Sequence, residues 1–358
     1  MRILLTGTHF TTAAATIPEL KKFRDVNLVY VGRSTTREGD STPSVESIEL
    51  PKLGVKFISI TAGRLQRTFT KYTIPSLFKI PIGFIQSPFI LLKDKPDVVL
   101  SFGGYVGVPI VFWAWLLSIP VIIHEQTLVS GLANKISSIF ANKIAVSFEA
   151  EDSFKGEKVV LTGNPIRNEI LTTKVSRKKS LLPTILITGG NQGSHVLNVA
   201  VEEVLDELTK KAFVIHQTGD SKFKDFERLE NRQNERYTVR KFISSDWVNV
   251  LSKVDLVIGR AGINTLSELA YLGIPTLVVP VPYLYNDEQS KNAKYFEKLG
   301  LVKVLPQSKL SGSTLLNEVK DMLKGLGQIR ENAKQAKEVI IPDAAKRLAI
   351  QTIILASE

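Results

Sequence analysis

The sequence of 358 residues contains no cysteine. A disulfide scaffold, a thiolate metal site and a cysteine nucleophile are therefore excluded, and the composition fits a reducing cytoplasm. Hydrophobic residues make up 44% of the chain and charged residues 23%. These shares are close to globular averages and exclude a wholly disordered chain, while the length suggests two domains.

The sequence motifs that commonly bind nucleotides are also missing. No G-x-G-x-x-G sequence follows a predicted strand, and Gly32-Arg33 stands where an NAD site needs an acidic residue for the ribose. No G-K-S/T follows a glycine loop, so a P-loop is excluded. The sequence has no D-x-D pair and no histidine and carboxylate cluster, so we expect no metal. No cofactor is expected either.

Basic residues outnumber acidic ones by 46 to 35, a net charge of +11 that favours anionic partners. No known nucleic-acid motif or aromatic-basic pattern is present, so nucleic acid is not expected as a partner. Met1-Arg2 leads directly into an apolar run, which indicates a strand and not a secretory signal. Residues 101–123 carry no charge, but glycines and prolines divide them into a turn, a helix near Pro109–Leu117 and a strand at Val121–Ile123.

Short β-branched runs alternate with helical patterns along the chain, which predicts parallel sheets covered by helices. The pattern starts twice, at Arg2 and again at Thr184, with a basic, proline-ended linker at 174–183 between the two halves. The predicted fold is α/β, with two doubly wound, Rossmann-like domains facing across a cleft. The expected strands are Arg2–Leu5, Asn27–Val31, Asp97–Leu100, Val121–Ile123, Lys143–Val146, Thr184–Thr188, Ala212–Gln217, Leu256–Ile258 and Thr276–Val279.

Residues Gly259–Ala270 combine a strand end, a glycine turn and a helix start. Backbone N–H groups at such a helix N-terminus can bind the phosphates of a nucleotide diphosphate. Glu268 lies one turn further on, where its carboxylate could accept hydrogen bonds from two ribose hydroxyls. The alternative is that Thr265 and Glu268 only form a capping box, because S/T-x-x-E is its signature.

Together with the motifs around it, this segment resembles the donor site of the MurG family, the peptidoglycan N-acetylglucosaminyltransferases of the glycosyltransferase-B fold. The resemblance covers nearly the whole chain. The matching motifs are Ser101–Val106, His124–Gln126, Thr162–Arg167, Gly189–Gly193, His216–Gly219, Gly262–Glu268, Gly273–Pro280 and Asn286–Ala293.

The resemblance implies three parts of the chain. Residues 1–163 would be the N-terminal acceptor- and membrane-binding domain, and residues 164–340 the C-terminal UDP-sugar-binding domain. Residues 341–358 would form a C-terminal helix that packs back on the N-terminal domain.

The resemblance also implies roles for single residues. Glu268 would hold the ribose of UDP, Arg167 the phosphates, the backbone of Ile243 the uracil, and Gln289 the sugar hydroxyls. Asn191 stands where a serine usually contacts the diphosphate. The other expected donor-binding residues are Thr6, Gly7, Thr8, Thr127, Ile263, Asn264, Thr265, Leu266 and Ser267, and the expected acceptor-binding residues are Gly103, Gly104, Tyr105 and His124.

The chain departs from the family pattern in the first loop and at Thr127, and in the first loop Thr12 stands where the family has a proline. Thr8 replaces a glycine of the first loop, which limits close backbone approach to the acceptor diphosphate. His9 remains as the expected catalytic base, although a histidine there could also serve only local backbone contacts. Thr127 replaces an asparagine that contacts the donor sugar, and the neighbouring Glu125 would either be catalytic or brace its loop.

A membrane contact is expected from residues 72–92, which are apolar apart from Lys79. Prolines at 75, 81 and 88 argue against one continuous span. The segment would either pack on the sheet or leave an apolar patch that binds an anionic membrane surface, helped by Arg64, Arg67, Lys71 and Lys79. Peripheral attachment to the cytoplasmic face of the cell membrane is therefore expected.

The function implied by the resemblance is inverting transfer of N-acetylglucosamine from UDP-N-acetylglucosamine to a polyprenyl-diphosphate-linked muramoyl-peptide. Two alternatives remain open. One is a transferase of the same fold that uses another lipid acceptor. The other is a UDP-sugar-binding protein without turnover.

Overall fold

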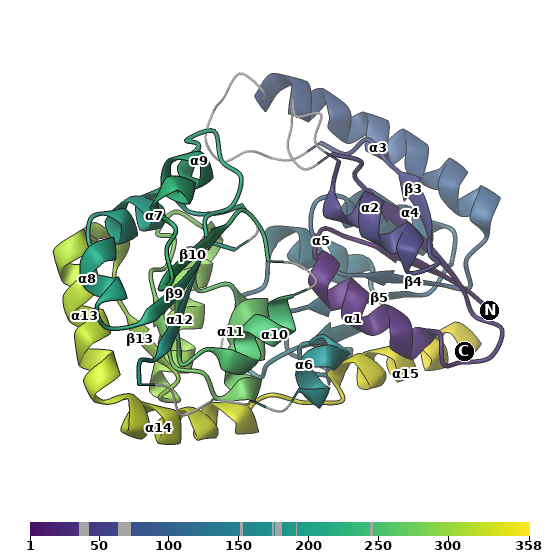
Figure 1. Ribbon diagram of the computed structural model, residues 1–358. Helices are drawn as coiled ribbons and strands as arrows, with labels where there is room; N and C mark the ends of the chain where they lie inside the picture. Colours follow the sequence, from purple (N-terminus) through teal and green to yellow (C-terminus); the bar gives the residue numbers. More distant parts are fainter. Residues whose placement is uncertain are drawn as a thin grey trace. The chain divides into compact units, whose positions relative to one another are not determined.

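The computed structural model describes residues 1–35, 43–63, 73–150, 153–173, 175, 181–190, 192–243 and 246–358. The chain forms two compact units (Figure 1). Unit 1 comprises Met1–Arg167 and Ile341–Glu358, and unit 2 comprises Asn168–Ile340. The basic residues Arg64, Arg67 and Lys71 and most of the expected linker 174–183 lie outside the described residues.

In the described part of unit 1, seven parallel strands form one sheet in the order β3-β2-β1-β4-β5-β6-β7. The chain runs outward from β1 to β3 and then returns to β4 on the other side of β1, which makes the sheet doubly wound. The strands are β1 Arg2–Thr6, β2 Asn27–Gly32, β3 Lys56–Ser59, β4 Val98–Ser101, β5 Val121–Glu125, β6 Lys143–Val146 and β7 Val159–Leu161.

Helices cover both faces of this sheet because successive strand residues point to opposite sides. Ile3 and Leu5 of β1 pack in one core with α1, α2 and α15, whereas Leu4 packs in a second core with α3 and α4. The helices are α1 Phe10–Leu20, α2 Val45–Lys52, α3 Thr73–Asp94, α4 Gly107–Leu116, α5 Leu132–Phe140 and α15 Ala344–Ser357.

The C-terminal helix α15 belongs to unit 1, although the whole of unit 2 precedes it in the sequence. It packs against α1, and Figure 1 shows its yellow ribbon beside the purple α1. Leu348, Ala349 and Leu355 of α15 are buried in the same core as Ile3 and Leu5. Burial of this apolar face stabilises unit 1 through residues from both ends of the chain.

Helix α3 runs without a break from Thr73 to Asp94 and contains Pro81 and Pro88. The prolines therefore do not interrupt the helix and do not by themselves argue against a membrane span; the expectation that this segment does not span the membrane stays a prediction. Each proline removes one backbone N–H from the helix, but the helix continues, and the hydroxyl of Ser87 donates to the carbonyl of Gly83 at 2.7 Å. Among the described residues, this is the one helix long and apolar enough to cross a bilayer.

The described strands of unit 2 form a second parallel sheet in the order β10-β9-β8-β11-β12-β13. The chain again starts in the middle, at β8, and returns beside it at β11. The two parallel, doubly wound sheets predicted from the sequence are thus confirmed. The strands are β8 Thr184–Thr188, β9 Phe213–Gln217, β10 Tyr237–Arg240, β11 Leu256–Gly259, β12 Thr276–Val278 and β13 Val302–Val304.

One face of this second sheet packs in a common core with α7, α8, α9 and α13. On α11, seven of the ten residues are buried, and this helix contacts α6, α12 and α14. The helices of unit 2 are α6 Asn168–Thr172, α7 His195–Glu202, α8 Leu205–Thr209, α9 Asp225–Leu229, α10 Trp247–Lys253, α11 Ile263–Leu272, α12 Glu288–Lys298, α13 Gly312–Lys324 and α14 Leu326–Glu338, with short 3-10 turns at Glu230–Arg232, Tyr285–Asp287 and Gln307–Lys309.

The packing of α15 can be tested by one truncation. Leu348→Ala removes a fully buried side chain and leaves a cavity, so we expect it to lower the free energy of unfolding of unit 1 by about 2–5 kcal/mol. Ile354→Ala on the same helix is the matched control, because Ile354 is largely exposed. Scanning calorimetry measures the unfolding of both variants. An equal, small decrease in unfolding temperature for the two variants would contradict this role of α15.

Candidate functional site

The loops at the carboxyl ends of the central strands are the natural ligand positions in doubly wound sheets. In unit 2 the direction of winding changes between β8 and β11. The loop Gly189–Gly193 follows β8, and the turn before α11 follows β11. The sequence motifs singled out for phosphate binding therefore lie on adjacent strands. Asn191 lies outside the described residues.

The glycine loop after β8 is packed against the loop after β9. Gly193 has a φ of +71°, and a Cβ atom there would lie 2.0 Å from the carbonyl oxygen of Thr218. A Cβ atom on Gly219 would lie 2.3 Å from the nitrogen of Gly193. Only glycine fits at these two positions, because the two backbones touch.

Gln217, the last residue of β9, joins this glycine loop to the loop after β10. Its side chain is almost completely buried. The amide nitrogen donates to the carbonyl of Gly190 at 3.0 Å, and the amide oxygen accepts from the N–H of Ile243 at 3.1 Å. The expected uracil-reading residue Ile243 is thus held by a side chain that the sequence analysis did not assign, and its backbone N–H already has a partner.

Helix α11 begins at Ile263, with Gly262 as its N-cap and without a side-chain cap. The N–H groups of the first turn, from Ile263, Asn264 and Thr265, therefore have the geometry of an anion site. Thr265 lies inside the helix and does not cap it, so the alternative of a capping box with Glu268 was wrong. Ser267 is buried and donates to the carbonyl of Ile263 at 2.9 Å, while Leu266 points into the core.

Glu268 lies in the second turn of α11 and is only 2% exposed. Its Oε2 accepts a hydrogen bond from Nε1 of Trp247 at 2.8 Å. A buried carboxylate needs such donors, because desolvation without compensation is costly. Glu268 therefore has a defined partner in this unit, which the sequence pattern did not indicate.

Arg260 is a further charged group at this edge that the sequence analysis missed. Its guanidinium donates to the carbonyl of Val279 and to the hydroxyl of Ser194, both at 2.7 Å. Burial lowers the pKa of this guanidinium, but an arginine remains charged in proteins. Because Ser194 is the N-cap of α7, Arg260 links the end of β11 to the start of α7. Its place directly after a central strand was the available signal.

Two other residues predicted to bind the UDP-sugar donor, Gln289 and Arg167, do not lie on the loops after β8 and β11. Gln289, in the first turn of α12, accepts the N–H of Val281 through its side-chain oxygen at 3.0 Å. The preceding residues Asn286 and Asp287 both have left-handed φ values, +48° and +56°. Arg167 is half-buried between β7 and α6.

In unit 1 the winding changes between β1 and β4, and the loops after these strands interlock. The N–H of Thr8 donates to the carbonyl of Gly103 at 3.0 Å. A Cβ atom on Gly104 would lie 2.1 Å from the Thr8 hydroxyl, so the threonine side chain fills the space over Gly104. Thr6 is buried and donates to the carbonyl of Val31, whereas Tyr105 is half-buried.

His9 is the N-cap of α1 and is half-buried at this same edge. Burial, with the positive charge of Arg33 as a second cause, lowers the pKa of its imidazole to about 4. The ring is therefore neutral near pH 7 and can accept a proton. His124, at the end of β5, is completely buried, and burial lowers its pKa to about 4 as well. Its Nε2 lies 3.2 Å from both the Gly163 carbonyl and the Ser147 hydroxyl.

Glu125 holds together the loop that follows β5. Its Oε1 accepts the N–H of Thr127 at 3.1 Å, and its Oε2 accepts the N–H of Gly131 and the amide of Asn134 at 3.0 Å. Burial raises the pKa of Glu125, and these donors oppose that rise. The hydroxyl of Thr127 lies 2.6 Å from the carbonyl of Val129. The contacts favour the bracing role over the catalytic one, and both roles remain predictions.

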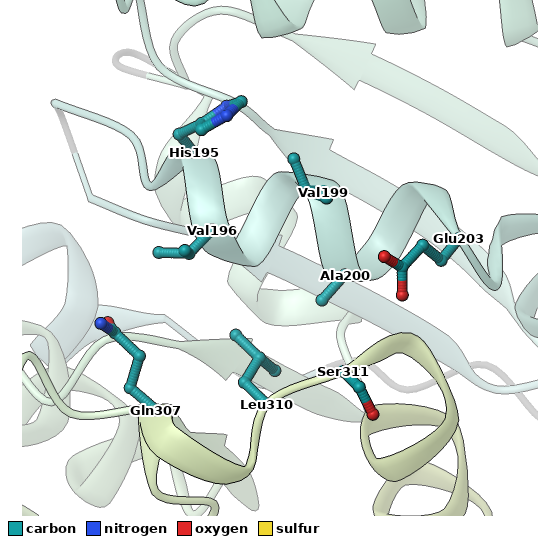
Figure 2. Close-up of a pocket in the computed structure, with 8 residues that line it drawn as sticks. All are labelled: His195, Val196, Val199, Ala200, Glu203, Gln307, Leu310 and Ser311. Carbon is teal, nitrogen blue, oxygen red and sulfur yellow. The ribbon is translucent and has the colours of Figure 1, made fainter.

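A separate pocket of about 260 Å³ lies between α7 and the segment before α13 (Figure 2). None of the predicted site residues lines it. Its histidine and its carboxylate have structural partners: Nδ1 of His195 lies 2.8 Å from Oδ1 of Asp225, and Glu203 accepts the N–H of Gly312 at 2.8 Å. The pocket is lined by His195, Val196, Val199, Ala200, Glu203, Gln307, Leu310 and Ser311.

Comparison with known proteins agrees with this arrangement. Residues 6–146 match the glycosyltransferase family 28 N-terminal domain, and residues 184–348 match the glycosyltransferase family 28 C-terminal domain. A Bacillus cereus protein named UDP-N-acetylglucosamine--N-acetylmuramyl-(pentapeptide) pyrophosphoryl-undecaprenol N-acetylglucosamine transferase 1 is 34% identical over 362 residues, covering 97% of each chain. A Clostridium botulinum transferase of the same name, without the number, is 34% identical over 351 residues, covering 94% of this chain and 95% of its own.

Solved structures lead to the same fold. Acinetobacter baumannii MurG has a TM-score of 0.74 and 25% identity, with 99% of each chain covered. The calicheamicin glycosyltransferase CalG4 has a TM-score of 0.72 at 13% identity, covering 100% of this chain and 98% of its own, which shows the fold alone. The glycosyltransferase-B architecture expected from the sequence is confirmed.

Proposed function

Because the chain belongs to glycosyltransferase family 28, and within it to the MurG group, we propose that it transfers N-acetylglucosamine from UDP-N-acetylglucosamine to polyprenyl-diphosphate-linked muramoyl-pentapeptide in peptidoglycan synthesis. The observation that carries this proposal is the match over 97% of the chain to a transferase of that name. The enzyme is a UDP-N-acetylglucosamine-dependent glycosyltransferase.

Unit 2 would bind the donor. The uncapped first turn of α11 supplies backbone N–H groups and the positive end of the helix dipole for the diphosphate. Arg260 would add positive charge, whose stabilising effect is greatest as UDP leaves with the electron pair of the broken bond. Arg167, which belongs to unit 1, is the arginine that the family resemblance assigns to the phosphates. Glu268 would accept hydrogen bonds from the ribose hydroxyls, and Gln289 would bind the hydroxyls of the donor sugar. Ile243 has its N–H bonded to Gln217, so its carbonyl would be the group that accepts the uracil N3–H.

Unit 1 would bind the acceptor and supply the base. The acceptor hydroxyl attacks the anomeric carbon, the bond from this carbon to the UDP oxygen breaks, and the configuration inverts. His9 would take the hydroxyl proton, since its imidazole is neutral near pH 7. His124 and Glu125 are buried beneath this edge, so their effect on the acceptor would pass through the loops they hold.

One observation keeps a second acceptor in consideration. The Thr8 side chain occupies the space over Gly104, where a glycine would leave room for a ligand. A transferase of the same fold acting on another lipid acceptor would fit this filled loop. Lipid acceptors compared against a fixed UDP-N-acetylglucosamine donor would separate the two candidates.

The activity is tested with UDP-N-acetylglucosamine and a short-chain polyprenyl-diphosphate muramoyl-pentapeptide, with the disaccharide product detected by mass spectrometry. We expect product from the native protein and a loss of at least about 100-fold in kcat for His9→Ala, the usual scale for a general base. His195→Ala, a histidine with no assigned role, is the matched control. Donor binding without product from any acceptor would indicate a binding protein.

The same assay gives a pH profile. The basic, neutral form of His9 exists above its pKa of about 4, so kcat/KM should stay level from about pH 7 down to about pH 5 and fall only below that. An acid limb centred near the ordinary histidine value of about 6.5 would contradict the burial of His9 or its role as base.

Removal of the Glu268 carboxylate tests the donor site. We expect Glu268→Ala to weaken UDP binding by about 1.5–3 kcal/mol, the scale of hydrogen bonds to a charged group. Isothermal titration calorimetry measures the change, and Glu331→Ala on the exposed face of α14 is the control. If the affinity for UDP does not change, Glu268 serves only as the partner of Trp247.

The protein would reach its lipid-linked acceptor through the exposed face of α3. Ile74, Phe78, Ile82, Ile85, Phe89 and Leu92 recur at helical spacing and form the α3 stripe, in which Phe78 is 71% and Phe89 69% exposed. Only 22% of the apolar window of this helix is buried. Such a stripe, on a chain of net charge +11, suits peripheral binding to the anionic cytoplasmic face of the cell membrane.

Vesicle binding tests the α3 stripe. Phe78→Ser combined with Phe89→Ser should lower partitioning onto phosphatidylglycerol-containing vesicles by at least about tenfold. The reason is that each phenylalanine side chain that the bilayer buries contributes about 1.5–3 kcal/mol to binding. Ile354→Ser removes an exposed apolar group from α15, on the opposite face of the sheet, and should leave partitioning unchanged. Equal sedimentation of both variants with vesicles would exclude α3 as the membrane contact.

A further inference from the structure

The hydrogen bond between Trp247 and Glu268 joins two helices of unit 2 that are separate in the sequence. Trp247 is the first residue of α10, and Glu268 lies in the middle of α11. The indole Nε1 donates to Oε2 of the carboxylate at 2.8 Å. Trp247 is 7% exposed, so the bond is shielded from solvent on both sides.

The chemistry of the two groups makes this bond directional. An indole has a single polar atom, a donor, and packing of its ring leaves that N–H only one orientation. A carboxylate has about four acceptor positions, so one donor on Oε2 leaves capacity for further donors. The bond therefore restrains the rotation of the carboxylate without using up its ability to accept hydrogen bonds.

The position of Trp247 connects this restraint to nucleoside binding. It lies four residues after Ile243, whose N–H is held by Gln217, and Gln217 in turn binds Gly190. Gln217 thus joins the expected base-reading residue to the glycine loop by hydrogen bonds, and α10 begins only four residues further along the chain. A phenylalanine at position 247 could fill the same space but would offer no donor to Glu268.

We propose that Trp247 is a positioning residue for nucleoside recognition, whose indole N–H orients the Glu268 carboxylate toward the two ribose hydroxyls of a uridine diphosphate. The inference rests on the proposed donor role of unit 2. The ribose hydroxyls donate to the carboxylate, and Trp247 itself does not touch the ligand's hydroxyls. Its effect should then depend on those hydroxyls being present.

Trp247→Phe tests the proposal with two ligands, UDP and 2′,3′-dideoxy-UDP, each measured by isothermal titration calorimetry. We expect the Kd for UDP to rise about five- to tenfold, while the Kd for the dideoxy ligand changes less than about twofold. At saturating UDP-N-acetylglucosamine, kcat should be retained, because the ribose contact is the same in the ground and transition states. Trp113→Phe is the matched control, since no hydrogen-bond partner of its indole is found in the described structure.

The outcomes separate the inference from the proposed function. Equal weakening of both ligands by Trp247→Phe would give Trp247 a merely structural role and overturn the inference, as would unchanged UDP affinity. A native protein that binds both ligands equally would instead remove the ribose role of Glu268. A native protein that binds no UDP would overturn the donor role of unit 2.

A second measurement does not depend on the variant folding. In native protein labelled with ¹⁵N-tryptophan, the indole resonances of Trp113 and Trp115 are assigned from their phenylalanine variants, which identifies Trp247 by elimination. UDP should shift the Trp247 indole resonance, and 2′,3′-dideoxy-UDP should shift it much less. Equal shifts with the two ligands, or none with UDP, would contradict a positioning role.

Discussion

The shape of the loops at the carboxyl edges depends on a few buried polar side chains. Gln217 joins Gly190 to Ile243, Glu125 gathers Thr127, Gly131 and Asn134, and Trp247 fixes Glu268. A buried polar group left without partners costs free energy, so each arrangement is favoured over nearby alternatives. The strands place the loops at one edge, and these side chains decide where the loop atoms lie.

The sequence predicted the inner strands well and the outer ones not at all. All nine expected strands are present within two residues, whereas β3, β7, β10 and β13 were missed. These four are the edges of the two sheets. Inner strands are buried on both faces and appear as apolar runs, while β3 and β7 are short and half-exposed, so their composition carries no comparable signal.

The same contrast holds for the candidate sites. Residues in motifs, such as Glu268 and Gly193, could be found because spacing and glycine content indicate a turn and a helix start. Trp247 and Gln217 could not be found, since their roles come from tertiary contacts with Glu268 and Ile243. For Arg260 the sequence offered one signal, its place directly after a central strand, but not its contact with Ser194. The capping-box alternative failed for a related reason: helix α11 begins at Ile263, two residues before Thr265, and its N-cap is Gly262, which the pattern did not mark.

Burial lowers the pKa of both kinds of group that the proposed reaction needs, but the resulting charge states differ. For His9 it lowers the pKa to about 4, which keeps the imidazole neutral near pH 7 but makes it a weak base in the free protein. For Arg260 burial lowers the pKa from a value so high that the charge persists. A neutral base and a permanent positive charge can therefore both persist in partly buried positions, as the proposed reaction requires.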